Sequence, residues 1–119
     1  MLVDFHTHTD ASDGALKPRE LLDRAHLLGL NQLAITDHDT LDGWRSVRHH
    51  WEEFGSNLKL RTGIELSSEW QGNSIHVLGI DVDPENPCLI LLEDQQRMAR
   101  YERATKISNR LSKVGIKGA

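Results

Sequence analysis

Two histidines stand one residue apart near the start of the sequence, in the stretch DFHTHTDASDG (residues 4–14). Asp13 follows His6 and His8 in the same stretch, so two imidazoles and a carboxylate are close together along the chain. Imidazole nitrogens and carboxylate oxygens are the ligands that proteins use for Zn, Mn and Fe. The residue types and their spacing therefore indicate metal binding.

Further groups of the same chemistry occur later in the sequence. His38 lies in the stretch TDHD, and Glu65 and His76 follow. A lone histidine such as His76 is more often a core or surface residue, but the H-x-H pair and the TDHD stretch together favour a metal site. A carboxylate such as Glu65 can bridge two ions, and a site with several metals clamps a phosphoryl group and lowers the pKa of bound water. The residues thus point to phosphoryl chemistry.

The elements that must position these side chains follow from hydrophobic periodicity and from turn residues. Four strands are predicted, over residues 2–6, 32–36, 58–67 and 74–80. Three helices are predicted, from Pro18 to just before Gly29, over 41–54 and over 88–114. The apolar face of the second helix carries Leu41, Trp44, Val47, Trp51 and Phe54, and Gly55 ends it. Strands that alternate with helices predict an α/β fold of parallel βαβ units.

The candidate ligands fall at or just past the carboxyl ends of the predicted strands. His6 and His8 share one side of the first strand if it extends that far, because strand side chains alternate between faces. The second strand runs directly into His38, and we place Glu65 late in the third strand and His76 in the fourth. Sites in parallel α/β folds gather at the carboxyl ends of strands. We therefore expect all these side chains to converge at one edge of the sheet.

The composition excludes several classes of protein. Of the 119 residues, 38% are hydrophobic and 27% are charged, which is typical of a soluble globular domain. No window approaches the roughly 18 consecutive apolar residues of a membrane span, and Met1 leads into the first strand without room for a signal peptide. Cys88 is the only cysteine, so no internal disulfide can form. We expect a cytoplasmic protein without a membrane partner.

The charge is distributed unevenly. Residues 1–96 hold 7 Lys+Arg and 17 Asp+Glu, whereas residues 97–119 hold 7 Lys+Arg and only Glu102. The basic side chains recur every three or four residues along the last helix. This helix either presents a plain solvated face, supported by i,i+4 ion pairs, or contacts the phosphate backbone of a short RNA.

Four motifs in order resemble the PHP (polymerase and histidinol phosphatase) family: FHTHTDASDG (5–14), ITDHDT (35–40), GIELS (63–67) and HVLG (76–79). The histidinol phosphatase branch usually has a histidine at the position of Asp13. The Ser-Asp-Gly here, together with TDHDT and IELS, is similar to the branch of nucleoside 3′,5′-bisphosphate phosphatases, which includes bacterial 5′→3′ exoribonucleases.

The resemblance implies the N-terminal half of a distorted (β/α)₇ barrel, mostly parallel strands with flanking helices, around up to three divalent ions, Mn or Zn/Fe. It implies that His6, His8 and Glu65 bind one ion, that Glu65 bridges to a second ion with His76, and that Asp13 and His38 bind the third. The nucleophile is a metal-activated water, so no catalytic side chain is assigned. Three further carboxylates would orient the imidazoles or would only cap helices and face solvent: Asp4, Asp37 and Asp39.

Domains of this branch exceed 200 residues and supply a histidine and an Asp-x-His pair from their second half. We therefore expect residues 1–119 to be the N-terminal part of a single PHP domain, with exposed barrel edges that could self-associate and no stable protein partner.

The expected function is metal-dependent phosphoester hydrolysis, with nucleoside 3′,5′-bisphosphates or short RNA 5′ ends as substrates. The alternatives are a histidinol-phosphate-type phosphatase, a polymerase-associated proofreading exonuclease, or a catalytically silent metal-binding module.

Overall fold

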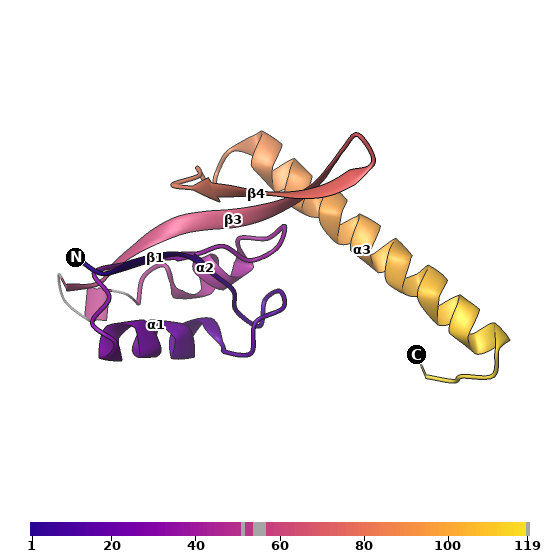
Figure 1. The fold of residues 1–119 in the computed structure, drawn as a ribbon, viewed down its shortest axis with the longest axis horizontal. Coiled ribbons are helices and arrows are strands. Elements are labelled where there is room, and N and C mark those ends of the chain that lie inside the picture. Colours follow the sequence, from indigo (N-terminus) through magenta and orange to yellow (C-terminus); the bar gives the residue numbers. More distant parts are fainter. Residues whose placement is uncertain (51, 54–56, 119) are drawn as a thin grey trace. The chain divides into compact units, whose positions relative to one another are not determined.

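The computed structural model describes residues 1–50, 52–53 and 57–118. The chain divides into two compact units, Met1–Pro84 and Glu85–Ala119, and each is described here by itself. The first unit contains β1 (Val3–Thr7), α1 (Pro18–Leu27), β2 (Gln32–Ile35), α2 (Asp42–Val47), β3 (Lys59–Trp70) and β4 (Asn73–Ile80) (Figure 1). The second unit contains α3 (Pro87–Lys113). The predicted order of strands and helices is confirmed.

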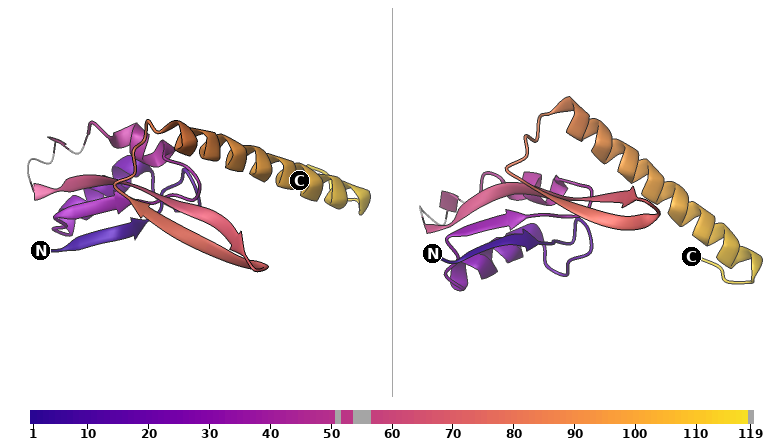
Figure 2. Two further views of the ribbon diagram at one scale, coloured as in Figure 1. Left: turned by 90° about the horizontal axis from the view of Figure 1, so that it is seen from above. Right: turned by 45° about the horizontal axis from the view of Figure 1, so that its top comes forward.

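The four strands form one sheet in the order β1-β2-β3-β4. β1 pairs with β2 and β2 with β3 in parallel, whereas β3 and β4 form an antiparallel hairpin. β3 has twelve residues and pairs with two strands along its length. Residues 59–62 pair with β2, and residues 63–70 pair with β4. Figure 2 shows the hairpin extending past the ends of β1 and β2. The mostly parallel α/β fold class is thus confirmed.

The core lies between the sheet and the two helices that follow β1 and β2. Leu22 and Ala25 of α1 pack with Leu33 and Ile35 of β2 and with Val47 of α2. Pro18 occupies the first turn of α1, and Gly29, with a φ of 76°, follows its end in the left-handed region that glycine adopts without strain. These are the helix boundaries expected from the sequence.

The helix predicted over 41–54 is shorter in the structure, and this part of the prediction is wrong. α2 ends at Val47, and the backbone then closes tighter i,i+3 hydrogen bonds, from the His50 N–H to the Val47 carbonyl and from the Glu53 N–H to the His50 carbonyl. The hydrophobic period continues past Val47, whereas the described residues 48–50 and 52–53 lie outside the α-helix. Trp51, Phe54 and Gly55 lie outside the described residues.

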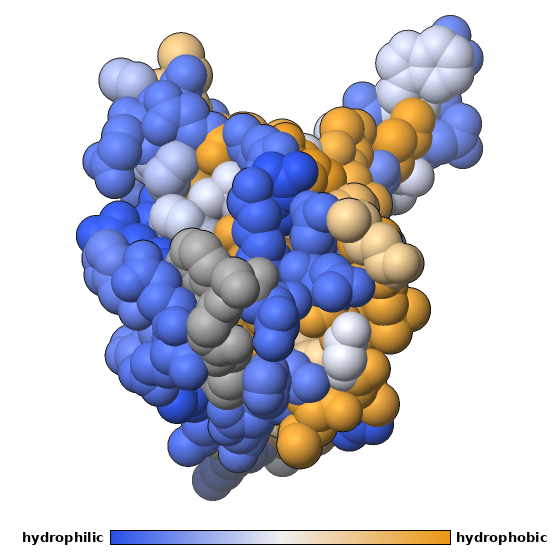
Figure 3. Space-filling model, turned by 90° about the vertical axis from the view of Figure 1, so that its left-hand side faces the viewer, coloured by the Kyte–Doolittle hydropathy of each residue, from blue (hydrophilic) through white to orange (hydrophobic). Residues whose placement is uncertain are grey.

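The sheet of the first unit leaves apolar side chains at the surface. Val3 and Phe5 of β1 are exposed, and so are Ile75, Val77 and others along β4. Figure 3 shows hydrophobic side chains gathered over one side of the surface. Exposed apolar side chains gathered in this way are typical of a surface that meets another part of a protein.

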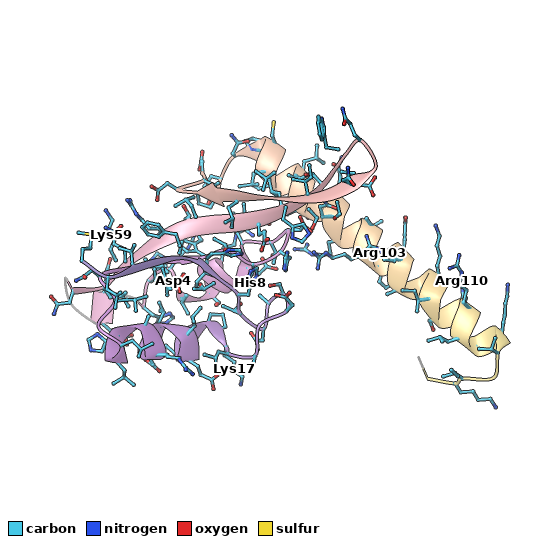
Figure 4. The ribbon with its side chains drawn as sticks, viewed as in Figure 1. Asp4, His8, Lys17, Lys59, Arg103 and Arg110 are labelled. Carbon is cyan, nitrogen blue, oxygen red and sulfur yellow. The ribbon has the colours of Figure 1, made fainter. Side chains whose placement is uncertain are left out.

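The helix of the second unit begins at a capped end. The Asn86 side chain accepts hydrogen bonds from the backbone N–H groups of Cys88 and Leu89, and Pro87 fills the first helical position. The basic side chains of its later turns, including Arg103 and Arg110, are exposed (Figure 4). In the described part of the chain, no helix is long and apolar enough to cross a membrane.

Leu22 offers a direct test of the core. Its side chain is 0% exposed, so Leu22→Ala should lower the free energy of unfolding by about 2–5 kcal/mol, measured by urea denaturation. Leu27 lies on the same helix and is 84% exposed, so Leu27→Ala should change it by less than about 0.5 kcal/mol. Equal losses for the two variants would contradict this assignment of the core.

Candidate metal centre

The carboxylate of Glu65 is the point at which the candidate ligands meet. His6 Nε2 and His8 Nε2 lie 3.1 Å and 2.9 Å from Glu65 Oε2. His38 Nδ1 lies 3.6 Å from the same oxygen, and His76 Nδ1 lies 3.1 Å from Oε1. The Glu65 side chain is only 8% exposed, so four imidazoles surround one nearly buried carboxylate.

Asp13 is the second carboxylate of this cluster and lies beside His8 and His38. Its Oδ2 lies 3.1 Å from His38 Nε2, and its Oδ1 lies 3.4 Å from His8 Nδ1. The rings of His8 and His38 are stacked, with centroids 4.6 Å apart. In Figure 4, His8 lies at the end of the sheet away from Lys59, the residue at which β3 begins. The expected convergence of all six residues at one edge of the sheet is confirmed.

Backbone pairing beyond the end of β2 brings His38 to Glu65. The Glu65 N–H donates to the carbonyl of Asp37, and the Asp39 N–H donates to the carbonyl of Glu65. His38 and Glu65 are thereby paired in parallel, although β2 itself has ended at Ile35. His38 therefore enters the site from an extended segment that β3 holds in register.

Two residues reach the site by a route other than the expected strand ends. Glu65 lies in the middle of β3, at the level where the β2 pairing gives way to β4. His76 lies within β4, which runs antiparallel, and it pairs with Ser67, two residues beyond Glu65 on the same face of the hairpin. A diagonal cross-strand contact, rather than a strand end, thus brings His76 to the carboxylate.

The pKa values of both carboxylates of the cluster lie below their ordinary values. Burial raises the pKa of Glu65, but hydrogen bonds from His6 and His76 and the charges of His38 and His6 bring that pKa below its ordinary value. Desolvation likewise raises the pKa of Asp13, but the charges of His38 and His8 outweigh this effect, so the pKa of Asp13 lies below its ordinary value. Both groups are therefore ionised at neutral pH, the form in which a carboxylate binds a cation.

The six residues form three groups in which one atom of each member lies within 4.8 Å of the others: His6, His8 and Glu65; His8, Asp13 and His38; and His38, Glu65 and His76. The first group is the one that the resemblance implied. The other two contain the implied pairs, Asp13 with His38 and Glu65 with His76, and each gains another histidine. His8, His38 and Glu65 therefore each belong to two groups.

The chemistry of the cluster fits divalent cations. His8 Nδ1 is buried and has no hydrogen-bond partner, although it faces the Asp13 carboxylate. Buried polar atoms are normally paired, and an exception needs an explanation such as an ion. Clustered imidazole nitrogens and ionised carboxylates supply the donors that Zn, Mn and Fe take.

The three carboxylates proposed to orient imidazoles make their described contacts with backbone and hydroxyl groups. Asp4 Oδ1 accepts the His6 backbone N–H, and Asp39 Oδ1 accepts the backbone N–H of Ser67. Asp37 accepts hydrogen bonds from Thr9 and Ser12. These contacts fix the backbone next to the candidate ligands.

Three residues that contact Asp37 were not identified from the sequence: Thr9, Ser12 and Gly43. The two hydroxyl residues bind Asp37, and Gly43 leaves the space for its carboxylate. The available signal was the hydroxyl residues of the stretch THTDAS (residues 7–12), a composition typical of tight turns.

Comparisons with known proteins agree with this geometry. The family model described as "PHP domain" matches residues 4–114. A 5′-3′ exoribonuclease of Haemophilus influenzae is 40% identical over 98% of this chain and 42% of its own length. A 3′,5′-nucleoside bisphosphate phosphatase of Chromobacterium violaceum is 34% identical over 98% of this chain and 40% of its own length.

One solved structure, of a protein from Bifidobacterium adolescentis described as a metal-dependent phosphoesterase, superimposes with a TM-score of 0.84 at 38% identity. The superposition covers 93% of this chain and 38% of that one. The chain thus spans about two fifths of the length of the relatives that it matches.

Glu65 belongs to two of the three groups and is the single carboxylate in each of them, so its removal should lower the metal content of both. Glu65→Gln keeps the volume but removes the charge, and we expect it to lose the Mn²⁺ or Zn²⁺ bound by both groups, measured by equilibrium dialysis. Glu69→Gln, an exposed change on the same strand, serves as the control. Unchanged metal content in Glu65→Gln would contradict the assignment.

Proposed function

Because this chain belongs to the PHP domain family, we propose that it supplies the metal-binding half of a metal-dependent phosphoesterase that hydrolyses nucleoside 3′,5′-bisphosphates or short RNA 5′ ends. The observation that carries the proposal is the convergence of four imidazoles and two ionised carboxylates at one edge of the sheet. The names of the exoribonuclease and the bisphosphate phosphatase give the substrate class.

The roles of the chain's own residues follow from the three groups. Each group would hold one metal ion. The first ion would be bound by His6, His8 and Glu65, and the second by His38, Glu65 and His76. The third would be bound by His8, Asp13 and His38. Divalent ions bound there, Mn or Zn/Fe and up to three of them, would activate water and stabilise the charge that develops on a phosphoryl group. Glu65 Oε2 lies beside His6 and Oε1 beside His76, so this carboxylate would contribute to two neighbouring metal positions and would offset part of the charge of the ions bound there.

We further propose that residues 1–119 are the N-terminal part of a single PHP domain. The support is that relatives which match almost the whole chain are more than twice as long. The exposed apolar side chains of β1 and β4 fit this proposal, because further elements of a barrel would cover them.

The other activities differ in ways that substrates can separate. A histidinol-phosphate-type phosphatase would prefer an amino-alcohol phosphate, and a proofreading exonuclease would be followed by a polymerase module. A silent module would bind metal without turnover. Asp13, in place of the histidine usual in the histidinol phosphatase branch, favours the nucleotide phosphatase.

Phosphate release in the presence of Mn²⁺ tests the proposal. The protein encoded by the complete gene should hydrolyse adenosine 3′,5′-bisphosphate and a 5′-phosphorylated RNA oligomer in preference to histidinol phosphate. The 119-residue chain should be at least about 100-fold slower, because one misplaced group in a metal site already costs that much.

His38→Ala in the complete protein is the negative control, since it removes a member of two groups. No turnover by the complete protein would contradict the function, and equal turnover by the two chains would contradict only the proposed division of the domain.

A further inference from the structure

The side chain of Asp37 lies in the interior of the first unit. Its side chain is 1% exposed and accepts three hydrogen bonds. The Thr9 backbone N–H and the Ser12 hydroxyl donate to Oδ1 at 2.6 Å and 2.7 Å, and the Thr9 hydroxyl donates to Oδ2 at 2.7 Å. A buried carboxylate is costly unless it is fully hydrogen-bonded. These three bonds supply that compensation, and all of them go to one loop.

Thr9 is the centre of that loop. Its carbonyl accepts the backbone N–H groups of Ser12 and Gly14, the two neighbours of Asp13. Its hydroxyl accepts the backbone N–H of Ala11 at 3.2 Å. Asp13 therefore lies between two residues that are both tied to Thr9, and Thr9 is tied to Asp37.

Asp37 is also the residue directly before His38 in the chain. It thus joins the loop that carries Asp13 to the segment that carries His38, and the two side chains meet at 3.1 Å. The Asp13 side chain is 66% exposed, so little of its surface is covered by neighbouring side chains. Its position depends on the loop.

The helix that follows leaves room for this arrangement. A Cβ atom on Gly43 would collide with Asp37 Oδ2 and would lie 2.7 Å from Thr9 Oγ1. Gly43 is buried at the start of α2, where alanine would otherwise be the better helix former. The absence of a side chain there preserves the contact between Asp37 and Thr9.

We propose that Asp37 is a positioning residue that sets Asp13 against His8 and His38 and thereby sets the affinity of that group for a divalent ion. Asp37 does not reach the ion itself but acts through Thr9 and Ser12. The inference rests on the proposed function, since it requires the group of His8, Asp13 and His38 to bind metal. It assigns to Asp37 a role other than the orientation of an imidazole.

Co²⁺ titration of the 119-residue chain, followed by calorimetry and by the visible absorption of Co²⁺, tests this role. Asp37→Ala should weaken the Co²⁺ affinity of the group of His8, Asp13 and His38 about 10-fold to 100-fold, the usual effect of removing a residue that orients a ligand. Asp37→Asn should retain most of the affinity, because the amide oxygen can still accept from Thr9 and Ser12. The remaining sites should keep their absorption spectrum.

Ser12→Ala provides a milder variant in case Asp37→Ala does not fold. It removes one hydroxyl from Asp37 and should weaken the same class of site. Asp10→Ala, an exposed aspartate in the same loop, is the matched control and should leave the titration unchanged. Gly43→Ala should act like Ser12→Ala, because the added methyl group displaces Asp37 or Thr9.

The decisive comparison uses Asp13→Ala as the background. If Asp37 acts through Asp13, adding Ser12→Ala or Asp37→Ala to Asp13→Ala should cause no further loss of Co²⁺ affinity. A purely structural role predicts losses that add, or losses spread over all sites, and either result would overturn the inference. Absence of Co²⁺ binding by the unmodified chain would overturn this inference and the metal positions that it requires, whereas turnover by the complete protein tests the proposed function separately.

Discussion

The backbone pairing of residues 37–39 with Glu65 is the constraint on which the site depends. It continues the parallel register past the end of β2, where Asp39 adopts a φ of 56° and its carboxylate accepts the Ser67 N–H. Strand geometry alternates side chains, so His38 turns toward Glu65 while Asp37 turns toward Thr9. One short segment therefore provides both a candidate ligand and the anchor of the opposite loop.

The sequence was sufficient to predict much of this arrangement. His6, His8 and His38 are close to strand ends, where parallel topology alone brings side chains together. The length of α2 was not predictable from periodicity, because the apolar spacing after Val47 is equally compatible with a tighter coil. The roles of His76 and Asp37 depend on contacts between distant segments, a diagonal in the β3–β4 hairpin and the bonds to Thr9. No local pattern contains that information.

The outer strands of the sheet make it an open structure. β1 and β4 are the edges, and both expose apolar side chains. Exposed edges with hydrophobic faces are usually covered or paired, since they otherwise invite association. The cluster of candidate ligands lies where β1 and β2 end, and it includes Glu65 and His76 from within β3 and β4.

The double pairing of β3 has a consequence for the order in which the site forms during folding. Trp70 pairs with its near neighbour Asn73, whereas Val3 must find Gln32 and Gln32 must find Lys59. Closing a short loop costs less entropy than closing a long one, and hairpins form before distant strands pair. Glu65 and His76 should thus be adjacent while His6 and His8 are still unplaced. Hydrogen exchange during refolding would detect this as protection of the hairpin amides before those of β1, so a metal ion present early would meet the hairpin first.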